Sequence, residues 1–510
     1  MMKSLQRTTI SVLLGLGLVV ALRAACFPFS VEGIDAAGRI ALAIRWMHHA
    51  TLPTMHDCSQ FGPLPICLYA AILAVWNDPY SAPRFLSLLF GAATVVPLFF
   101  LARLLFNARA ALFACLFFAF YTLQVKSCST AQAEAPFGFL FLTCAFHLLR
   151  YRRDGRARDL ITAGILLSVA GMVRYEGWAY IPLMGLLAMR PSARYAVKPA
   201  LGFCALACVL PVIWMTINFI KIGNPLCAWD FIFEDHARLA QIIVARYGRL
   251  GAVVYSFFFH PTVLLLSLTP AVALLAMTGL VRSIARRETL AYALLFLPSI
   301  AFFGLTLLLR MAPLARLLTT TGLLLLPYAG AQMDVWTSSL SSAHALRRVL
   351  VVLVSAALVF AGLAFAAYTP GFPFQQKLWS VAPVSPFLPE ERRVFNLLKG
   401  RWRPGVKLVQ DDSPYSHVLI FNLSPNIYED WWRRPAIGDL PTPAARLDYL
   451  AASVPGLAVF DARCTDLSRL LNVPAARLSS LPGVAITPIY SSPMYLVYEL
   501  APRTTGVSPR

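Results

Sequence analysis

Charged side chains beside long apolar segments are the residues best able to do chemistry in this chain, because a charge near a membrane is costly. The richest such stretch runs from Glu32 to Arg45, and within it Asp35 and Arg39 lie four residues apart, on one helix face. A carboxylate in such a position can accept a proton from a hydroxyl group. The structural alternative is that Asp35 stabilises its helix N-terminus and pairs with Arg39, and the spacing alone favours this alternative.

Further ionisable residues stand at the ends of later apolar segments. Glu134 closes the stretch Ser127-Cys-Ser-Thr-Ala-Gln-Ala-Glu134, Arg174 and Glu176 belong to Arg174-Tyr-Glu-Gly-Trp178, and Arg310 and Arg316 flank a short connection. Guanidinium groups match phosphate geometry better than Lys does. The same residues can instead anchor span ends among lipid headgroups, orient a turn or, for Arg174 and Glu176, form an internal ion pair.

A loose group of metal-binding residue types lies in the same region as Asp35. It consists of His48, His49, His56 and Asp57, and its spacing is poor for a metal site. We therefore assign no metal ligands and keep a divalent cation as the less favoured alternative.

The composition indicates which class of protein must position these residues. Of the 510 residues, 58% are hydrophobic and 13% are charged, which is more apolar surface than one soluble core can hide. This predicts an integral membrane protein and excludes a soluble enzyme. The 44 Lys and Arg exceed the 24 Asp and Glu, an excess that basic cytoplasmic loops explain without nucleic acid.

Apolar runs long enough to cross a membrane recur along the first 370 residues. With the run 160–189 counted as a hairpin, they predict about 11 transmembrane helices, at 8–27, 84–105, 110–124, 135–149, 160–189, 199–220, 261–281, 289–309, 313–332 and 349–368. Every connection that a cytoplasmic N-terminus places inside is basic, as in Arg150 to Arg158. We therefore expect a cytoplasmic N-terminus and an extracytoplasmic C-terminal part.

Two domains follow from this pattern. Residues 1–370 are expected to form an all-α polytopic membrane domain, whose outside loop 28–83 carries two interfacial helices, one from Asp35 and one over Gly62–Trp76. Residues 371–510 are expected to form a small extracytoplasmic α/β domain. Its β-like runs are 406–409, 418–421, 457–460 and 495–498, and its helical stretches are 390–398 and 443–452.

The stretch from Asp35 to Phe106 resembles the membrane glycosyltransferases of the GT-C fold, which include the protein O-mannosyltransferases and the lipid A aminoarabinose transferases. The similarity rests on Asp35 opening the first outside helix, Leu52-Pro53, Gly62-Pro-Leu64, Ala82-Pro-Arg-Phe-Leu-Ser-Leu-Leu-Phe-Gly-Ala92 and Leu101-Ala-Arg-Leu-Leu-Phe106. The later motifs around Glu134 and Arg174, with Gly223-Asn-Pro225, extend it over residues 8 to 370. Many relatives carry two adjacent acids at the helix start, whereas Ala36 follows Asp35 here.

This resemblance implies a donor sugar carried on a polyisoprenyl phosphate and transferred at the outer membrane face to a hydroxyl group of a protein, lipid or glycan. It implies Asp35 as the general base of a direct displacement, which inverts the anomeric centre. Arg310, Arg316 and Arg174 are the candidates to stabilise the phosphate. The other expected substrate-binding residues are Arg39, Glu134 and Glu176. The protein is thus expected to be a glycosyltransferase of the plasma (inner) membrane that contacts membrane lipids and no nucleic acid.

A polytopic transporter or flippase is the alternative from another class. It predicts internal repeats and charges near span centres. The sequence shows no internal repeat, and its charges stand mostly at the outer ends of the spans. A purely structural or export role leaves Asp35 and the arginine pairs without a task.

Overall fold

The computed structural model describes residues 16–24, 34–48, 61–79, 81–189, 197–339, 387–411, 437, 440–462 and 466–502. The chain divides into two compact units, one of residues 1–30, 52–68 and 84–383 and one of residues 31–51, 69–83 and 384–510. Within the described residues, four helices are long and apolar enough to cross a membrane, or five if one bent pair counts as a span. The protein is therefore a largely helical, multi-pass membrane protein with a small C-terminal sheet.

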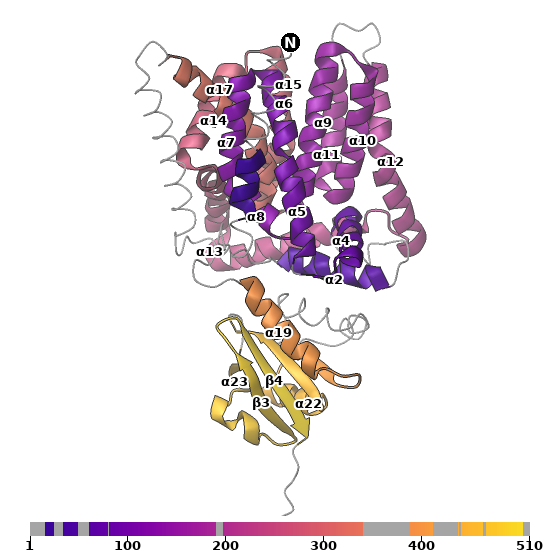
Figure 1. Cartoon of the computed structure of the whole chain (residues 1–510), viewed down its shortest axis with the longest axis vertical. Helices are drawn as coiled ribbons and strands as arrows, with labels where there is room; N and C mark the ends of the chain where they lie inside the picture. Colours follow the sequence, from indigo (N-terminus) through magenta and orange to yellow (C-terminus); the bar gives the residue numbers. More distant parts are fainter. Residues whose placement is uncertain are drawn as a thin grey trace, which may run out of the picture. The chain divides into compact units, whose positions relative to one another are not determined.

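Four neighbouring helices of the first unit pack side by side (Figure 1). They are α9 (Glu134–Asp154), α10 (Ala157–Val173), α11 (Glu176–Ala188) and α12 (Val197–Ile222). Helix α9 ends at Gly155, whose φ of 76° suits the left-handed cap of a helix. The predicted hairpin 160–189 is thus confirmed as the helix pair α10 and α11.

A second group contains α7 (Ala108–Phe120), α14 (Pro270–Ser283) and α17 (Thr319–Ser339), which Figure 1 shows beside one another. A Cβ atom at Gly330 would overlap the carbonyl oxygen of Ala110 on α7, and one at Gly279 would overlap that of Tyr328 on α17. Backbone therefore packs on backbone at both interfaces, as small residues allow between membrane helices. Helices α5 (Ala82–Ala93) and α6 (Val95–Leu105) form one candidate span, and α6 contacts both α7 and α9.

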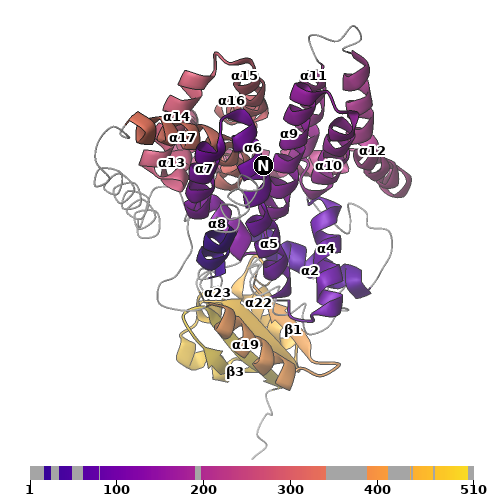
Figure 2. The ribbon, with the colours of Figure 1, turned by 45° about the horizontal axis from the view of Figure 1, so that its top comes forward.

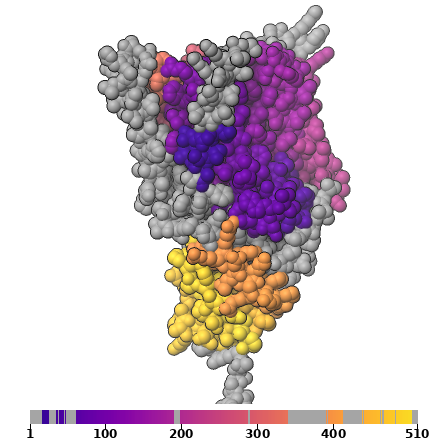
Figure 3. All heavy atoms as spheres, in the orientation of Figure 1, coloured from indigo at the N-terminus to yellow at the C-terminus, as the bar shows by residue number. Residues whose placement is uncertain are grey.

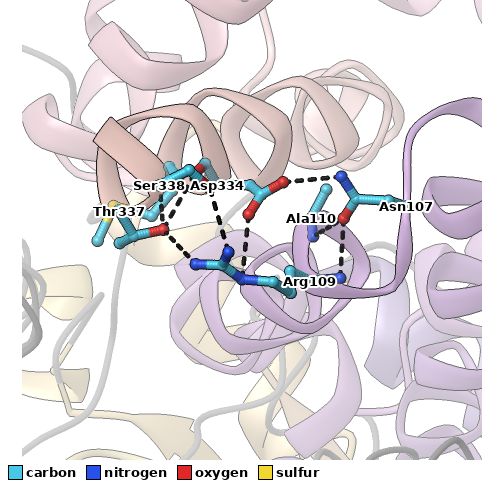
Figure 4. A network of polar contacts seen from close by, with 7 residues as sticks. Asn107, Arg109, Ala110, Asp334, Thr337 and Ser338 are labelled. Atoms are coloured by element: carbon cyan, nitrogen blue, oxygen red, sulfur yellow. Dashed lines mark hydrogen bonds and ion pairs between the residues drawn. The ribbon is translucent and has the colours of Figure 1, made fainter. Parts of the chain in front are cut away.

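A polar network ties the start of α7 to the end of α17 (Figure 4). Asn107 caps α7 by accepting from the backbone of Arg109 and Ala110, and its amide donates to Asp334 at 2.7 Å. Arg109 lies 3.2 Å from the Asp334 carboxylate and donates to the hydroxyl groups of Thr337 and Ser338. Asp334 of α17 is thus the acceptor shared by two donors at the start of α7.

Replacing Asp334 with Ala is expected to destabilise the protein by about 1–2 kcal/mol, because Asn107 and Arg109 both lose their shared acceptor. The midpoint of an SDS unfolding titration measures this loss. Ser338→Ala, which removes one exposed contact of Arg109, is the matched control and should cost less than about 0.5 kcal/mol. Equal midpoints for the two variants would contradict a central role for Asp334.

Two of the expected continuous spans are each divided into two helices in the structure. The run 110–124 ends as α7 at Phe120 and restarts as α8 (Thr122–Ser129), bent by 60°. The run 261–281 is divided between α13 (Cys227–Leu268) and α14 at Thr269, whose φ is 72°. Pro270 explains the second break, since a proline pushes the preceding residue out of the helical conformation.

The expected outside connection 221–260 is mostly helical. Its residues begin α13, which changes direction at Gly248, where φ is 70° and ψ is 167°. The next span consists of α15 (Arg287–Ala293), the 3₁₀ turn η2 (Leu294–Phe296) and α16 (Leu297–Leu307). The 3₁₀ turn η3 (Ala315–Leu318) then leads directly into α17.

The second unit contains a four-stranded sheet in the order β1-β2-β4-β3. Its strands are β1 (Lys407–Gln410), β2 (Gly456–Asp461), β3 (Val484–Ser491) and β4 (Tyr495–Pro502), with β1 parallel to β2 and the other pairs antiparallel. Three predicted strands are confirmed, and the run 418–421 lies outside the described residues. Strand β3 was not predicted, because Pro488 interrupts its pattern, and it lies at the sheet edge where proline is tolerated.

The helices expected in this unit are present as α19 (Phe387–Arg401) and α22 (Pro443–Ala451). The unit also contains α23 (Leu467–Leu471) and the 3₁₀ segment η5 (Ala475–Ser480). Helix α19 lies along the sheet (Figure 2), and Arg401 at its end donates to Glu499 of β4 at 2.6 Å. In Figure 3 the surface of α19 (orange) continues into that of the later segments (yellow). Arg392 of α19 binds Asp78 and Ser81, which belong to the same unit.

Candidate active site

The turn between α10 and α11 carries the closest cluster of the predicted site residues. Arg174 in this turn binds the carboxylates of Glu134 and Glu176, and its contact with Glu176 is 2.6 Å long. The side chain of Glu134 is only 2% exposed and that of Arg174 11%, whereas that of Glu176 is 31% exposed. The cluster therefore joins a buried carboxylate, a mostly buried guanidinium group and a partly exposed carboxylate.

The electrostatics of this cluster follow from its composition. Burial alone lowers the pKa of Arg174, but the two carboxylates outweigh burial and raise the pKa above its ordinary value. Arg174 is thus permanently charged. Two carboxylates around one guanidinium leave a net negative charge, which disfavours phosphate and suits ligands that donate hydrogen bonds.

Glu134 has one carboxylate oxygen left for a ligand. Its Oε1 accepts from Arg174, while its Oε2 is buried and has no hydrogen-bond partner among the described residues. Glu134 is the first residue of α9, where the helix dipole stabilises a carboxylate. A buried acceptor of this kind is costly unless a donor such as a sugar hydroxyl reaches it.

Two aromatic residues that the sequence analysis did not single out support this turn. The Tyr175 hydroxyl donates to the carbonyl oxygen of Phe61 at 3.2 Å, and Trp214 Nε1 donates to that hydroxyl at 3.1 Å. A Cβ atom at Gly62 would overlap the carbonyl oxygens of Met172 and Val173. The Gly62-Pro-Leu motif therefore packs on the backbone next to Arg174. The only sequence signal that Tyr175 supports the turn was its position between Arg174 and Glu176.

The two later arginines occupy different environments. Arg310 is exposed in the turn after α16. Arg316 is half-buried in η3, and its Nε atom is buried. Arg316 is thus the better enclosed of the two candidates for the phosphate.

Asp35 and Arg39 lie on α2 (Ile34–His48), one of the two helices predicted for loop 28–83; the other is α4 (Pro63–Val75). Asp35 stands in the first turn of α2 and is half-buried. Arg39 is 4% exposed, and Ile40 and Ile44 on the same helix are buried. Asp35 and Arg39 belong to the second unit, and the Arg174 cluster belongs to the first.

Most of the residues that could hold a metal ion near Asp35 lie outside the part of the chain that the structure describes. His49, His56 and Asp57 lie outside the described residues. Within the part of the chain that the structure describes, no group of three or more His, Cys, Asp or Glu residues could hold a metal ion.

Comparison with known proteins identifies the fold and the family to which part of the chain is similar. Residues 61–215 match the family model of dolichyl-phosphate-mannose-protein mannosyltransferase. The crystal structure of ArnT from Cupriavidus metallidurans bound to undecaprenyl phosphate matches with a TM-score of 0.63 and 14% identity, over 96% of this chain and 97% of that one. No curated protein matches the chain.

A second group of solved structures shares the fold. The Archaeoglobus fulgidus oligosaccharyltransferase in complex with Zn and sulfate matches with a TM-score of 0.58 and 14% identity, over 96% of this chain and 73% of that one. The archaeal oligosaccharyltransferase AglB from Archaeoglobus fulgidus, in complex with an inhibitory peptide and a dolichol-phosphate, has a TM-score of 0.54 and 13% identity, over 91% of this chain and 70% of that one. The family match and the shared fold confirm the predicted resemblance, and the match over residues 61–215 supports the predicted enzyme class, a glycosyltransferase.

Proposed function

We propose that this chain, whose residues 61–215 match a family of lipid-phosphate-sugar mannosyltransferases, transfers a sugar from a polyisoprenyl-phosphate donor to a hydroxyl group at the outer membrane face. The observation that carries the proposal is the Arg174 cluster, which lies inside the matched residues. Its buried Glu134 Oε2 has no hydrogen-bond partner among the described residues and can accept a hydrogen bond from a hydroxyl group.

The chemistry is a single displacement at the anomeric carbon. Asp35 removes the proton of the acceptor hydroxyl as its oxygen bonds to that carbon, and the bond from the carbon to the phosphate oxygen breaks. The phosphate leaves on its lipid with the bonding electrons, so the anomeric centre is inverted. Arg39 lies one helical turn after Asp35 and supports its orientation.

The remaining residues divide by charge. Arg316 and Arg310 stabilise the leaving phosphate, since guanidinium groups match its geometry. Glu134 and Glu176 bind hydroxyl groups of the sugar or the acceptor. Arg174 spans both carboxylates and therefore acts as a positioning residue rather than as a phosphate ligand.

Transfer at the outer face agrees with the orientation that the spans and the basic loops predict for the chain in the plasma (inner) membrane. A cytoplasmic N-terminus and about 11 spans place residues 28–83 and 371–510 outside. Residues 1–370 then form the polytopic transferase domain, and residues 371–510 an extracytoplasmic α/β domain. The lipid tail of the donor lies in the bilayer while its sugar meets the outside loops.

The test is sugar transfer by the purified full-length protein in detergent, with a panel of radiolabelled polyprenyl-phosphate sugars. We expect release of free polyprenyl phosphate from at least one donor, and Glu134→Gln should lower this release because it removes a charged acceptor. Glu499→Gln, which changes an exposed acid of the sheet, is the control. Movement of an intact lipid-linked sugar across proteoliposomes without release would contradict the proposal and favour a flippase.

A further inference from the structure

The break between α7 and α8 is held by contacts from distant parts of the chain. Ending a helix among apolar helices leaves its last carbonyl groups without partners. Arg23 meets this need by donating to the carbonyl oxygens of Phe118 and Ala119, at 3.3 and 3.5 Å. The Thr122 hydroxyl donates to the carbonyl oxygen of Ser267 at 3.2 Å. The break is therefore a fixed joint between several helices.

Tyr121 is the residue at this joint, and its side chain is fully buried. Its single hydroxyl proton is shared between the carbonyl oxygens of Leu318 and Thr319, which lie 3.2 and 3.1 Å from the hydroxyl oxygen. Its ring lies directly on Gly322, where a Cβ atom would overlap it. These contacts fix the point where η3 ends and α17 begins.

We propose that Tyr121 positions the guanidinium group of Arg316 for a phosphate; this inference rests on the proposed role of Arg316. The turn η3 is four residues long, and Arg316 lies two residues before Leu318. A short 3₁₀ turn has few and poor internal hydrogen bonds, so its geometry depends on external contacts. Ring packing alone needs only a phenyl group. The hydroxyl adds a hydrogen bond to the backbone that follows Arg316, with its one proton shared between two carbonyl oxygens.

Tyr328 provides a matched control on α17. It is also fully buried, and its hydroxyl donates to a single carbonyl oxygen, that of Thr289, at 2.8 Å. Tyr328→Phe therefore removes a buried tyrosine hydroxyl from the same helix bundle without touching η3. A general loss of stability should appear in both variants, whereas an effect on Arg316 should appear only in Tyr121→Phe.

The experiment measures binding of undecaprenyl phosphate to the purified full-length protein, which requires no turnover. We expect Tyr121→Phe to raise the Kd about 10-fold, since small misplacements of a binding group cost large factors. Tyr328→Phe should leave the Kd within about twofold of the wild-type value. In an Arg316→Ala background, Tyr121→Phe should cause no further weakening, because the group that it positions is gone.

The other possible results contradict either the role of Tyr121, the phosphate role of Arg316 or the proposed function. Equal Kd values for Tyr121→Phe and wild type, or equal weakening with and without Arg316, would remove Tyr121 as a positioning residue. Failure of the wild-type protein to bind undecaprenyl phosphate, or an unchanged Kd in Arg316→Ala, would overturn this inference together with the phosphate role of Arg316. Tight binding that responds to Tyr121 but occurs without sugar transfer would support the inference and contradict the proposed function.

Discussion

Asp35→Asn is expected to lower the rate of sugar transfer by about 10²- to 10⁴-fold, the usual contribution of a positioned general base. Asparagine has the same shape as aspartate but cannot accept the proton of the acceptor hydroxyl. Donor binding should change little, because the residues proposed to bind the phosphate are Arg310 and Arg316. The measurement is the transfer rate at saturating donor, together with donor affinity.

The structural role of Asp35 predicts a different result. As a first-turn carboxylate of α2, Asp35 interacts with the helix dipole, and its loss costs about 0.3–1 kcal/mol of stability. That role leaves the transfer rate unchanged. Asp78→Asn, which alters the contact of Asp78 with Arg392 in the same unit, is the control and should retain activity. Full turnover by Asp35→Asn would remove Asp35 from the mechanism.

Arg174→Met is expected to destabilise the protein by about 3–5 kcal/mol, because it leaves the buried Glu134 carboxylate without its counter-charge. Glu176 is partly solvated and suffers less. Adding Glu134→Gln should restore most of the lost stability, since it removes the unpaired charge. The midpoint of SDS unfolding for the two single variants and the double variant measures this coupling.

The control for Arg174 is an arginine in an exposed pair. Arg153 binds Asp154 at 2.7 Å, and its side chain is 55% exposed. Arg153→Met should therefore cost less than about 1 kcal/mol. If Arg174→Met unfolds at the same SDS fraction as wild type, the pair with Glu134 is not the buried ion pair that the geometry indicates.

Hydropathy predicted α9 to α12 and α17, but neither the part of α13 before residue 260 nor the breaks between helices. The expected span 349–368 lies outside the described residues. The break at Thr269 had a local signal in Pro270, whereas the break at Tyr121 had none. Its contacts come from Arg23, Ser267 and Leu318, which are about a hundred or more residues away. Local sequence patterns cannot register such partners, so a continuous apolar run was predicted as one helix.

The site could be predicted only in part, because local sequence patterns show only partners that are close in the chain. Arg174 and Glu176 are two residues apart, so their ion pair was a natural alternative in the sequence. Glu134 is 40 residues from Arg174, and only the packing of α9 beside α10 and α11 brings them together. The negative character of the cluster, and with it the preference for hydroxyl groups over phosphate, required that third member.

The backbone contacts of α17 restrict how this protein can move. At Gly279 and Gly330 the backbone of α17 packs directly against that of α14 and α7, so rotation or sliding of the helix would force main-chain atoms into each other. Helices α7, α14 and α17 should therefore behave as one rigid body during a catalytic cycle. Entry of a lipid donor and exit of the lipid phosphate must then use displacements of other helices, around a stationary core that includes the start of α17.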